Sequence, residues 1–243
     1  MSSFETEKNE NYVDFDLDEY LGNNENRKPN KFGLYRLNCL VIGKTGSGKT
    51  TWLIKNLLAG NIDDFQKIIC IIPRESYDSG IYQRIRTDKR LKNHFIFYII
   101  GEESLPSVEE LNSIHMKIAL IVDDFINTFT KNDWLVLKRY ITQCSRITKG
   151  CSLFVLTQYL QLLPVAYRKN FNMFVIFVNS FSSLQFNDMM RSYYDNQVFD
   201  KQQLNELYNT TKSFAHTPLI AVNNGQPEHS LAFGDKWIIS TTH

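Results

Sequence analysis

Eight consecutive residues have the types and spacing of a phosphate-binding loop. The run Gly43-Lys44-Thr45-Gly46-Ser47-Gly48-Lys49-Thr50 fits the pattern G-x-x-x-x-G-K-[ST] without a mismatch. Glycine has no Cβ atom, so a loop of this kind can fold around an anion with its backbone N–H groups pointing inward. In this pattern the lysine reaches the β- and γ-phosphates and the last hydroxyl ligates Mg²⁺, tasks that fall to Lys49 and Thr50.

The residues on either side of this loop predict a strand and a helix. Residues 38–42 are a short apolar run typical of a buried strand, and residues 49–59 indicate a helix that ends near Gly60. The N-terminus of a helix carries a partial positive charge of about half a unit, which favours phosphate. This context favours a nucleotide site over a chance glycine turn. The expected ATP-binding residues are Gly43, Lys44, Thr45, Gly46, Ser47, Gly48, Lys49, Thr50 and Thr51.

Two further predicted strands end in polar residues that suit ATP hydrolysis. Residues 118–122 are apolar and end in Asp123-Asp124, the Walker B pattern. We expect Asp123 to hold Mg²⁺ with Thr50, and Asp124 to polarise the attacking water, as a general base or by orienting it, although a strand-end acid can also cap a turn. Strand 151–157 is followed by Gln158, which is either a γ-phosphate sensor or simply the end of the strand. Such sensors occur in NTPases that have an extra strand between the Walker A and Walker B strands.

The helix predicted at about 131–146 carries two arginines away from its apolar stripe. At 100° per residue, Arg139 and Arg146 lie within about 20° of each other and nearly opposite that stripe. We expect them to face outward near the catalytic edge, either as a solvated basic face or, for Arg146, as an arginine finger in a neighbouring subunit. The stripe expected to pack on the sheet consists of Trp134, Leu137, Ile141 and Cys144.

Apolar strands alternating with helices predict the fold class. The pattern is typical of α/β proteins with a mainly parallel sheet covered by helices on both faces. Together with the motifs, it predicts a P-loop NTPase of the additional-strand (ASCE, RecA/FtsK-like) type. The expected strands are 38–42, 67–72, 95–100, 117–122, 151–157 and 172–178, and further helix is expected at 80–92 and 107–113.

Three regions are expected along the chain. Residues 1–30 form an acidic, disordered or peripheral tail, because positions 1–26 hold eight acids and one base, a net charge of −7. Residues 31–180 form the P-loop ATPase core. Residues 181–243 add two amphipathic helices, the first with Phe186, Met189, Met190 and Tyr193 on one face, and two short strands, all packed on the core.

Composition narrows the classes of protein. With 43% apolar and 22% charged residues the chain is ordinary for a globular protein, and no apolar run approaches the roughly 20 residues needed to span a bilayer. The polar N-terminus predicts no secretory signal, so we expect no membrane or secreted location. No C-x-x-C pair occurs, which favours buried, reduced cysteines over a metal site. These cysteines are Cys39, Cys70, Cys144 and Cys151.

The order and spacing of these motifs resemble the poxvirus-type DNA-packaging ATPases. This viral branch of the FtsK–HerA superfamily is also found in giant viruses, virophages and Maverick-like elements. The resemblance covers about residues 36–180 and includes the run Leu163-Pro164-x-x-Tyr167-Arg168-x-Asn170. Within it, Asp124 replaces the glutamate common in the superfamily, and Ile147 replaces a histidine common in viral relatives.

The resemblance implies a ring-forming ATPase that uses ATP and Mg²⁺ to pump double-stranded DNA into a preformed capsid. Capsid vertex proteins would be partners. The location would be the host cytoplasm or nucleus, in a virus factory, or the virion. The resemblance also supports Gln158 as sensor and Arg146 as finger, with Arg168 and Asn170 as a further polar cluster near the site.

A DNA motor needs backbone contacts without base readout. The densest basic stretch supplies candidates, although a solvated helix face is the alternative: Arg84, Arg86, Lys89, Arg90 and Lys92. Two other functions use the same loop. A small-molecule kinase is disfavoured because the paired acids and Gln158 suit activation of a water, and a nucleotide-gated assembly NTPase is disfavoured by intact Lys49 and Asp124. A GTPase is disfavoured because no N-K-x-D motif occurs.

Overall fold

The computed structural model describes most of the chain beyond its N-terminal segment. The described residues are 37–58, 65–78, 80–125, 127–147, 149–193, 201–222, 231–233 and 236–238. The predicted acidic tail, residues 1–30, lies outside them, as does the side chain of Tyr193.

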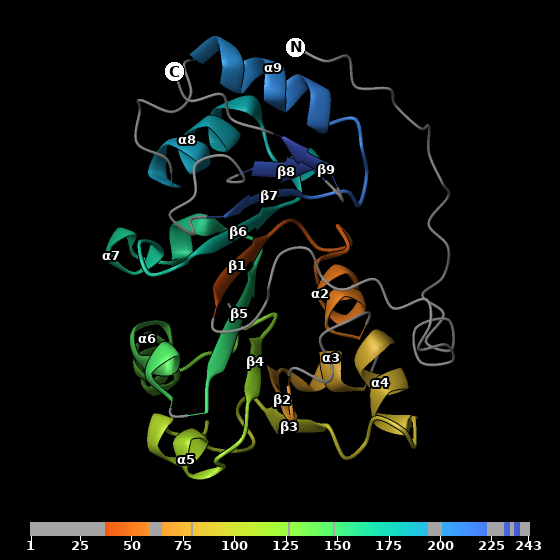
Figure 1. Ribbon diagram of the computed structural model, residues 1–243, viewed down its shortest axis with the longest axis vertical. Helices are drawn as coiled ribbons and strands as arrows, with labels where there is room; N and C mark the ends of the chain where they lie inside the picture. The colour runs from red at the N-terminus through yellow and green to blue at the C-terminus, as the bar shows by residue number, and fades with distance from the viewer. Residues whose placement is uncertain are drawn as a thin grey trace.

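The described residues form one nine-stranded sheet in the order β3-β2-β4-β5-β1-β6-β7-β8-β9 (Figure 1). Strands β3 to β6 in this order are parallel, and β7, β8 and β9 continue the sheet antiparallel. Strand β5 lies between β1 and β4, which confirms the predicted extra strand between the Walker A and Walker B strands. The bounds are β1 Asn38–Ile42, β2 Lys67–Ile72, β3 Phe95–Ile99, β4 Ile118–Val122, β5 Cys151–Thr157, β6 Met173–Ile176, β7 Leu219–Val222, β8 Leu231–Phe233 and β9 Lys236–Ile238.

Helices cover both faces of this sheet, as predicted. One apolar cluster joins the sheet to α2 and α4, and a second, on the other face, joins it to α5, α6, α8 and α9. The bounds are α2 Lys49–Leu58, α3 Arg74–Tyr77, α4 Gly80–Thr87, α5 Val108–Ser113, α6 Lys131–Gln143, α7 Val165–Arg168, α8 Ser183–Tyr193 and α9 Lys201–Thr211, with 3₁₀ turns η2 Cys144–Arg146, η3 Leu160–Leu162 and η4 Val178–Ser180.

The helix expected over 80–92 is shorter than predicted. Helix α4 ends at Thr87, and a turn over residues 88–94 leads to β3. The Asp88 carboxylate accepts a hydrogen bond from the backbone N–H of Arg90 at 2.8 Å. This local side-chain bond competes with helical hydrogen bonding, which explains the end of the helix in a stretch whose composition favours helix.

The C-terminal region extends the core sheet, since β7 pairs with β6. Phe186, Met189 and Met190 of α8 are buried, as the amphipathic pattern indicated. The division of the chain at residue 180 remains a prediction. All four cysteines are free and buried. Within the described residues, the helices are too short or too polar to cross a bilayer.

The central position of β5 makes its packing a test of the sheet. Phe154 is fully buried, so Phe154→Ala is expected to lower the free energy of unfolding by about 3–5 kcal/mol through lost contacts and a cavity. Leu135→Ala is the control, because that α6 side chain is 55% exposed and its loss is expected to cost less than about 0.5 kcal/mol. Urea unfolding measures both, and equal costs would contradict the assigned position of Phe154.

Candidate nucleotide-hydrolysis site

The loop between β1 and α2 has the backbone shape that the glycine pattern predicts. Gly46 and Gly48 have positive φ angles of 76° and 97°, which side chains with a Cβ rarely adopt. The Gly43 N–H donates to the Thr157 carbonyl at 3.1 Å, and the Lys44 N–H donates to Ser180 Oγ at 3.0 Å. The loop is therefore fastened to the ends of β5 and η4.

Lys49 lies over this loop. Its ammonium donates to the carbonyl oxygens of Gly43 at 2.7 Å and Lys44 at 3.0 Å. Partial burial lowers the pKa of Lys49, while the charges of Asp123 and Asp124 oppose that shift. The ammonium is thus held at the mouth of the loop, where the motif expects the β- and γ-phosphates.

Asp123 is a buried carboxylate at the end of β4. It is 5% exposed, and its Oδ2 accepts hydrogen bonds from Thr50 Oγ1 at 2.7 Å and from the Tyr82 hydroxyl at 2.9 Å. Burial raises the pKa of Asp123, and the two hydrogen bonds and the charge of Lys49 oppose this rise. The two expected Mg²⁺ ligands, Thr50 and Asp123, are therefore joined by a hydrogen bond, and their role as ligands remains a prediction.

Asp124 and Gln158 meet across neighbouring strand ends. Strands β4 and β5 are parallel, so the residues that follow them lie at the same edge of the sheet. Gln158 Nε2 donates to Asp124 Oδ1 at 3.4 Å, and Asp124 is exposed, with a φ of 55°. Both side chains line a cavity of about 220 Å³, whose lining also includes Thr45, Gly46, Lys49, Thr50, Ser76, Gly80, Ile81, Tyr82 and Asp123.

Thr50 and Asp123 are the residues that could hold Mg²⁺. Among the described residues, no group of three or more His, Cys, Asp or Glu side chains could hold a metal ion alone. This donor set fits Mg²⁺, which keeps several waters and is bound through one or two carboxylates together with substrate phosphates.

Arg146 and Arg168 lie at the opposite edge of the sheet, which corrects the expected position near the catalytic edge. Arg146 ends η2 just before β5 begins, and Arg168 ends α7 shortly before β6 begins. Asn38, the first residue of β1, donates to the carbonyls of Ile141 and Asn170 and marks this amino edge. Helical periodicity gave the outward face of the helix correctly, since Arg139 and Arg146 are exposed. It could not say at which edge the helix ends.

Arg168 is held within its own segment. Its Nε donates to the Leu163 carbonyl at 2.7 Å, and partial burial lowers its pKa. The expected polar cluster of Arg168 and Asn170 therefore does not reach the cavity of the same subunit.

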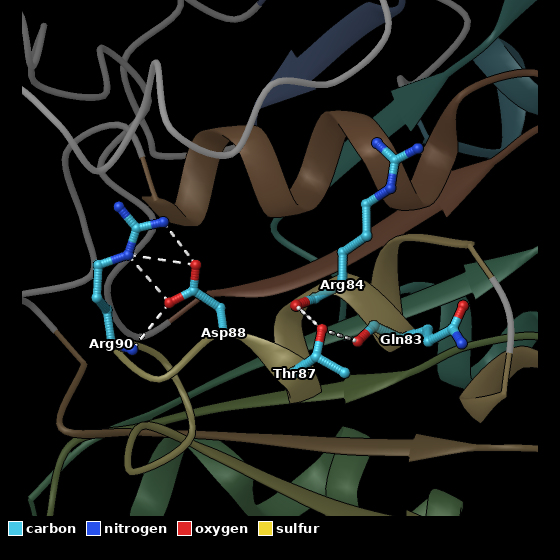
Figure 2. A network of polar contacts seen from close by, with 5 residues as sticks. All are labelled: Gln83, Arg84, Thr87, Asp88 and Arg90. Atoms are coloured by element: carbon cyan, nitrogen blue, oxygen red, sulfur yellow. Dashed lines mark hydrogen bonds and ion pairs between the residues drawn. The ribbon is translucent and has the colours of Figure 1, made fainter.

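The basic stretch surrounds the end of α4, and its members have different partners; Figure 2 shows Arg84 and Arg90 with their neighbours. The Arg90 guanidinium pairs with Asp88 and holds the pKa of that carboxyl below its usual range. Arg86 pairs with Asp78 at 3.6 Å and stacks over the Tyr77 ring at 4.0 Å. Exposed side chains at Arg84, Lys89 and Lys92 complete the stretch.

The sequence did not identify several residues of the site, among them Tyr82, Ser180 and His216. Tyr82 belongs to the apolar face of α4, where an aromatic residue indicates core packing. A ring nitrogen of His216 lies 3.1 Å from the Ser47 carbonyl oxygen, across 169 residues of sequence. Because a carbonyl only accepts, this nitrogen carries the proton. Contacts between segments this distant leave no local pattern in the sequence.

The sheet order and this site together define a P-loop NTPase of the additional-strand class. A family model described as Poxvirus A32 protein matches residues 28–220, which is 193 of the 243 residues, and the chain belongs to that family. No curated protein sequence matches the chain.

Solved structures share the fold at low sequence identity. The DNA-packaging ATPase B204 from Sulfolobus turreted icosahedral virus is 13% identical with a TM-score of 0.56, and the match covers 84% of this chain and 100% of that one. B204 from Sulfolobus turreted icosahedral virus 2, in complex with AMPPCP, is 14% identical with a TM-score of 0.51 and coverage of 84% and 99%. EssC (ATPases 2 and 3) from Geobacillus thermodenitrificans is 11% identical with a TM-score of 0.50 and coverage of 86% and 41%.

The His216 contact generates a prediction about the loop. His216→Ala removes a hydrogen bond from the Ser47 carbonyl, worth about 1 kcal/mol, so affinity for a non-hydrolysable ATP analogue is expected to fall about 5-fold. His115→Ala is the control, since His115 is also exposed with positive φ but lies between α5 and β4, at the amino edge. Titration calorimetry compares the two variants, and equal affinities would contradict a supporting role for His216.

Proposed function

We propose that this chain is an ATP-hydrolysing motor that moves double-stranded DNA into a viral capsid. The observation that carries the proposal is the meeting of Lys49, Asp124 and Gln158 around one cavity, in a member of the poxvirus A32 family. The shared fold with B204, described as a DNA-packaging ATPase, supports the same function.

The roles follow from chemistry at each position. Lys49 and the loop N–H groups hold the β- and γ-phosphates, with Gly43 to Thr51 as the ATP-binding segment. Thr50 and Asp123 would hold Mg²⁺, which would neutralise charge on the phosphate oxygens. Asp124 accepts a proton from the attacking water or orients it. Gln158 contacts the γ-phosphate and, through its hydrogen bond to Asp124, links the presence of that phosphate to the position of Asp124.

Hydrolysis explains this arrangement better than phosphoryl transfer to a small molecule. The paired side chains of Asp124 and Gln158 meet over the cavity, and Asp124 is open to solvent, so a water can reach it. A nucleotide-gated assembly protein with little turnover would not need this pair. Both alternatives predict ATP turnover that is indifferent to DNA.

The partners follow from the proposed work. Double-stranded DNA would bind without base readout through Arg84, Arg86, Lys89, Arg90 and Lys92, whose charges suit phosphates. Copies of the chain would form a ring, and capsid vertex proteins would dock it. We place this activity in the cytoplasm or nucleus of the host cell, within a virus factory, or at the virion.

Steady-state ATP hydrolysis with and without long double-stranded DNA tests this function. We expect DNA to raise the rate, and Lys49→Ala and Asp124→Asn to lower it by at least about 100-fold, because each removes a group that acts in phosphoryl transfer. Lys55→Ala is the matched control, since that lysine lies in the last turn of α2, away from the phosphate loop. A rate of ATP hydrolysis that is the same with and without DNA would contradict the motor function and indicate only a generic NTPase.

The amino-edge position of Arg146 generates a separate prediction about neighbouring subunits. An arginine outside its own site can stabilise the transition state only in another subunit, which we propose for Arg146, with Arg168 as a second candidate. Mixing Arg146→Ala subunits with Lys49→Ala subunits is therefore expected to restore ATPase activity that each variant lacks alone. Arg139→Ala replaces Arg146→Ala in the control mixture, because Arg139 is also exposed and lies about two turns earlier. Mixtures with no restored activity would exclude a finger at Arg146.

A further inference from the structure

Tyr82 links the predicted metal ligand to the helix that carries the basic stretch. Its side chain is 3% exposed, and its hydroxyl donates to Asp123 Oδ2 at 2.9 Å. The same oxygen accepts from Thr50 at 2.7 Å. Two donors from two different helices, α2 and α4, therefore fix the plane of one buried carboxylate.

The orientation of Asp123 decides how well it can serve a metal ion. Partners that hydrogen-bond to a ligating carboxylate set its orientation, and their loss typically costs 10- to 100-fold in metal affinity. Thr50 is itself an expected metal ligand, whereas Tyr82 is not. The hydrogen bond from Tyr82 can therefore act on metal binding through the orientation of Asp123. The ring cannot swing away freely, because it stands edge-on to Phe97 of β3, with centroids 6.2 Å apart.

Tyr82 lies on α4, and the hydrogen bonds at the C-terminal end of this helix connect Gln83 and Arg84 to Thr87, and Asp88 to Arg90 (Figure 2). The Thr87 hydroxyl donates to the carbonyls of Gln83 and Arg84, each at 3.0 Å, and the Asp88 N–H donates to Arg84 O at 3.1 Å. The Asp88 carboxylate then accepts from the backbone and the side chain of Arg90. The segment from Tyr82 to Arg90 is thus a continuous hydrogen-bonded unit.

We propose that Tyr82 is a positioning residue for Asp123 and that α4 couples DNA bound at the basic stretch to the metal–nucleotide site. The second half rests on the proposed function, and the first half does not. DNA phosphates would compete with the Asp88 carboxylate for Arg90. Because the backbone N–H of Asp88 bonds the last turn of α4, loss of that carboxylate contact would loosen the turn that follows the helix. Coupling between two sites is reciprocal, so DNA and the Mg²⁺-bound nucleotide change each other's affinity by the same factor.

Tyr82→Phe tests the first half, because it deletes the hydroxyl and keeps the ring against Phe97. We expect about 10-fold more Mg²⁺ to be needed for half-maximal binding of AMPPCP, with binding in EDTA unchanged. Tyr77→Phe is the control, since the Tyr77 ring also packs edge-on to Phe97. Wild-type Mg²⁺ dependence in Tyr82→Phe would overturn the role of Tyr82. If that variant unfolds at a lower temperature than Tyr77→Phe, Thr50→Ser with Tyr82→Phe in a double-mutant cycle decides the coupling at Asp123.

Asp88→Ala tests the second half without weakening the basic stretch. Removing this acid leaves every lysine and arginine in place, so affinity for DNA is expected to hold or rise. We expect the effect of DNA on AMPPCP affinity in the presence of Mg²⁺ to shrink at least about 3-fold, with the Mg²⁺ dependence in the absence of DNA unchanged. Asp133→Ala, at the start of α6 on the other face of the sheet, is the matched acid-to-alanine control.

The outcomes separate the two proposals. If the wild-type chain does not bind DNA, the proposed motor fails, while the Mg²⁺ titration of Tyr82→Phe still decides the first half. If DNA raises ATP hydrolysis and Asp88→Ala keeps the full effect of DNA on nucleotide affinity, the motor stands and coupling through α4 is overturned.

Discussion

The charge of Asp123 is the constraint on which the catalytic edge depends. A carboxylate buried to this extent is costly unless hydrogen bonds and an opposite charge compensate for it. The compensation comes from Thr50, Tyr82 and Lys49, which belong to the start of α2, to α4 and to the phosphate loop. The loop, the Walker B strand and α4 must therefore be in place together. The same contacts around Asp123 thus orient the expected metal ligand and hold α2, α4 and β4 together at the carboxyl edge of the sheet.

The two edges of the sheet carry different chemistry. The carboxyl edge holds the cavity, whereas the amino edge holds Arg146 and Arg168. A site that needs an arginine from another copy must then be completed by a contact between unlike surfaces. Contacts of this head-to-tail kind generate rings when the rotation closes, whereas a two-fold contact pairs like with like. The position of the arginines therefore supports the proposed ring more than a two-fold dimer.

The parts of this site that consist of consecutive residues could be predicted from the sequence. The phosphate loop and the paired acids each occupy a few consecutive residues, and the additional strand followed from Gln158 at the end of β5. Tyr82 was missed because its position on α4 matches ordinary core packing, and only the fold places its hydroxyl on Asp123. His216 was missed because its partner is 169 residues away. The edge assigned to Arg146 was wrong because periodicity defines a face of a helix and not the end of the sheet that it approaches.

The place of β1 in the sheet sets an order of events during synthesis. It is the first described strand in the chain, yet it lies between β5 and β6, and its register partners are residues 153–157 on one side and 173–176 on the other. During synthesis, the apolar residues 38–42 therefore lack their partner strands until more than a hundred later residues have left the ribosome. Parallel pairing over such separations is slow and leaves strand edges open to association. The phosphate loop follows β1 directly, so in a nascent chain the nucleotide site can form only after β5 and β6 have been synthesised. A chaperone that shields β1 would therefore act before the chain can bind nucleotide.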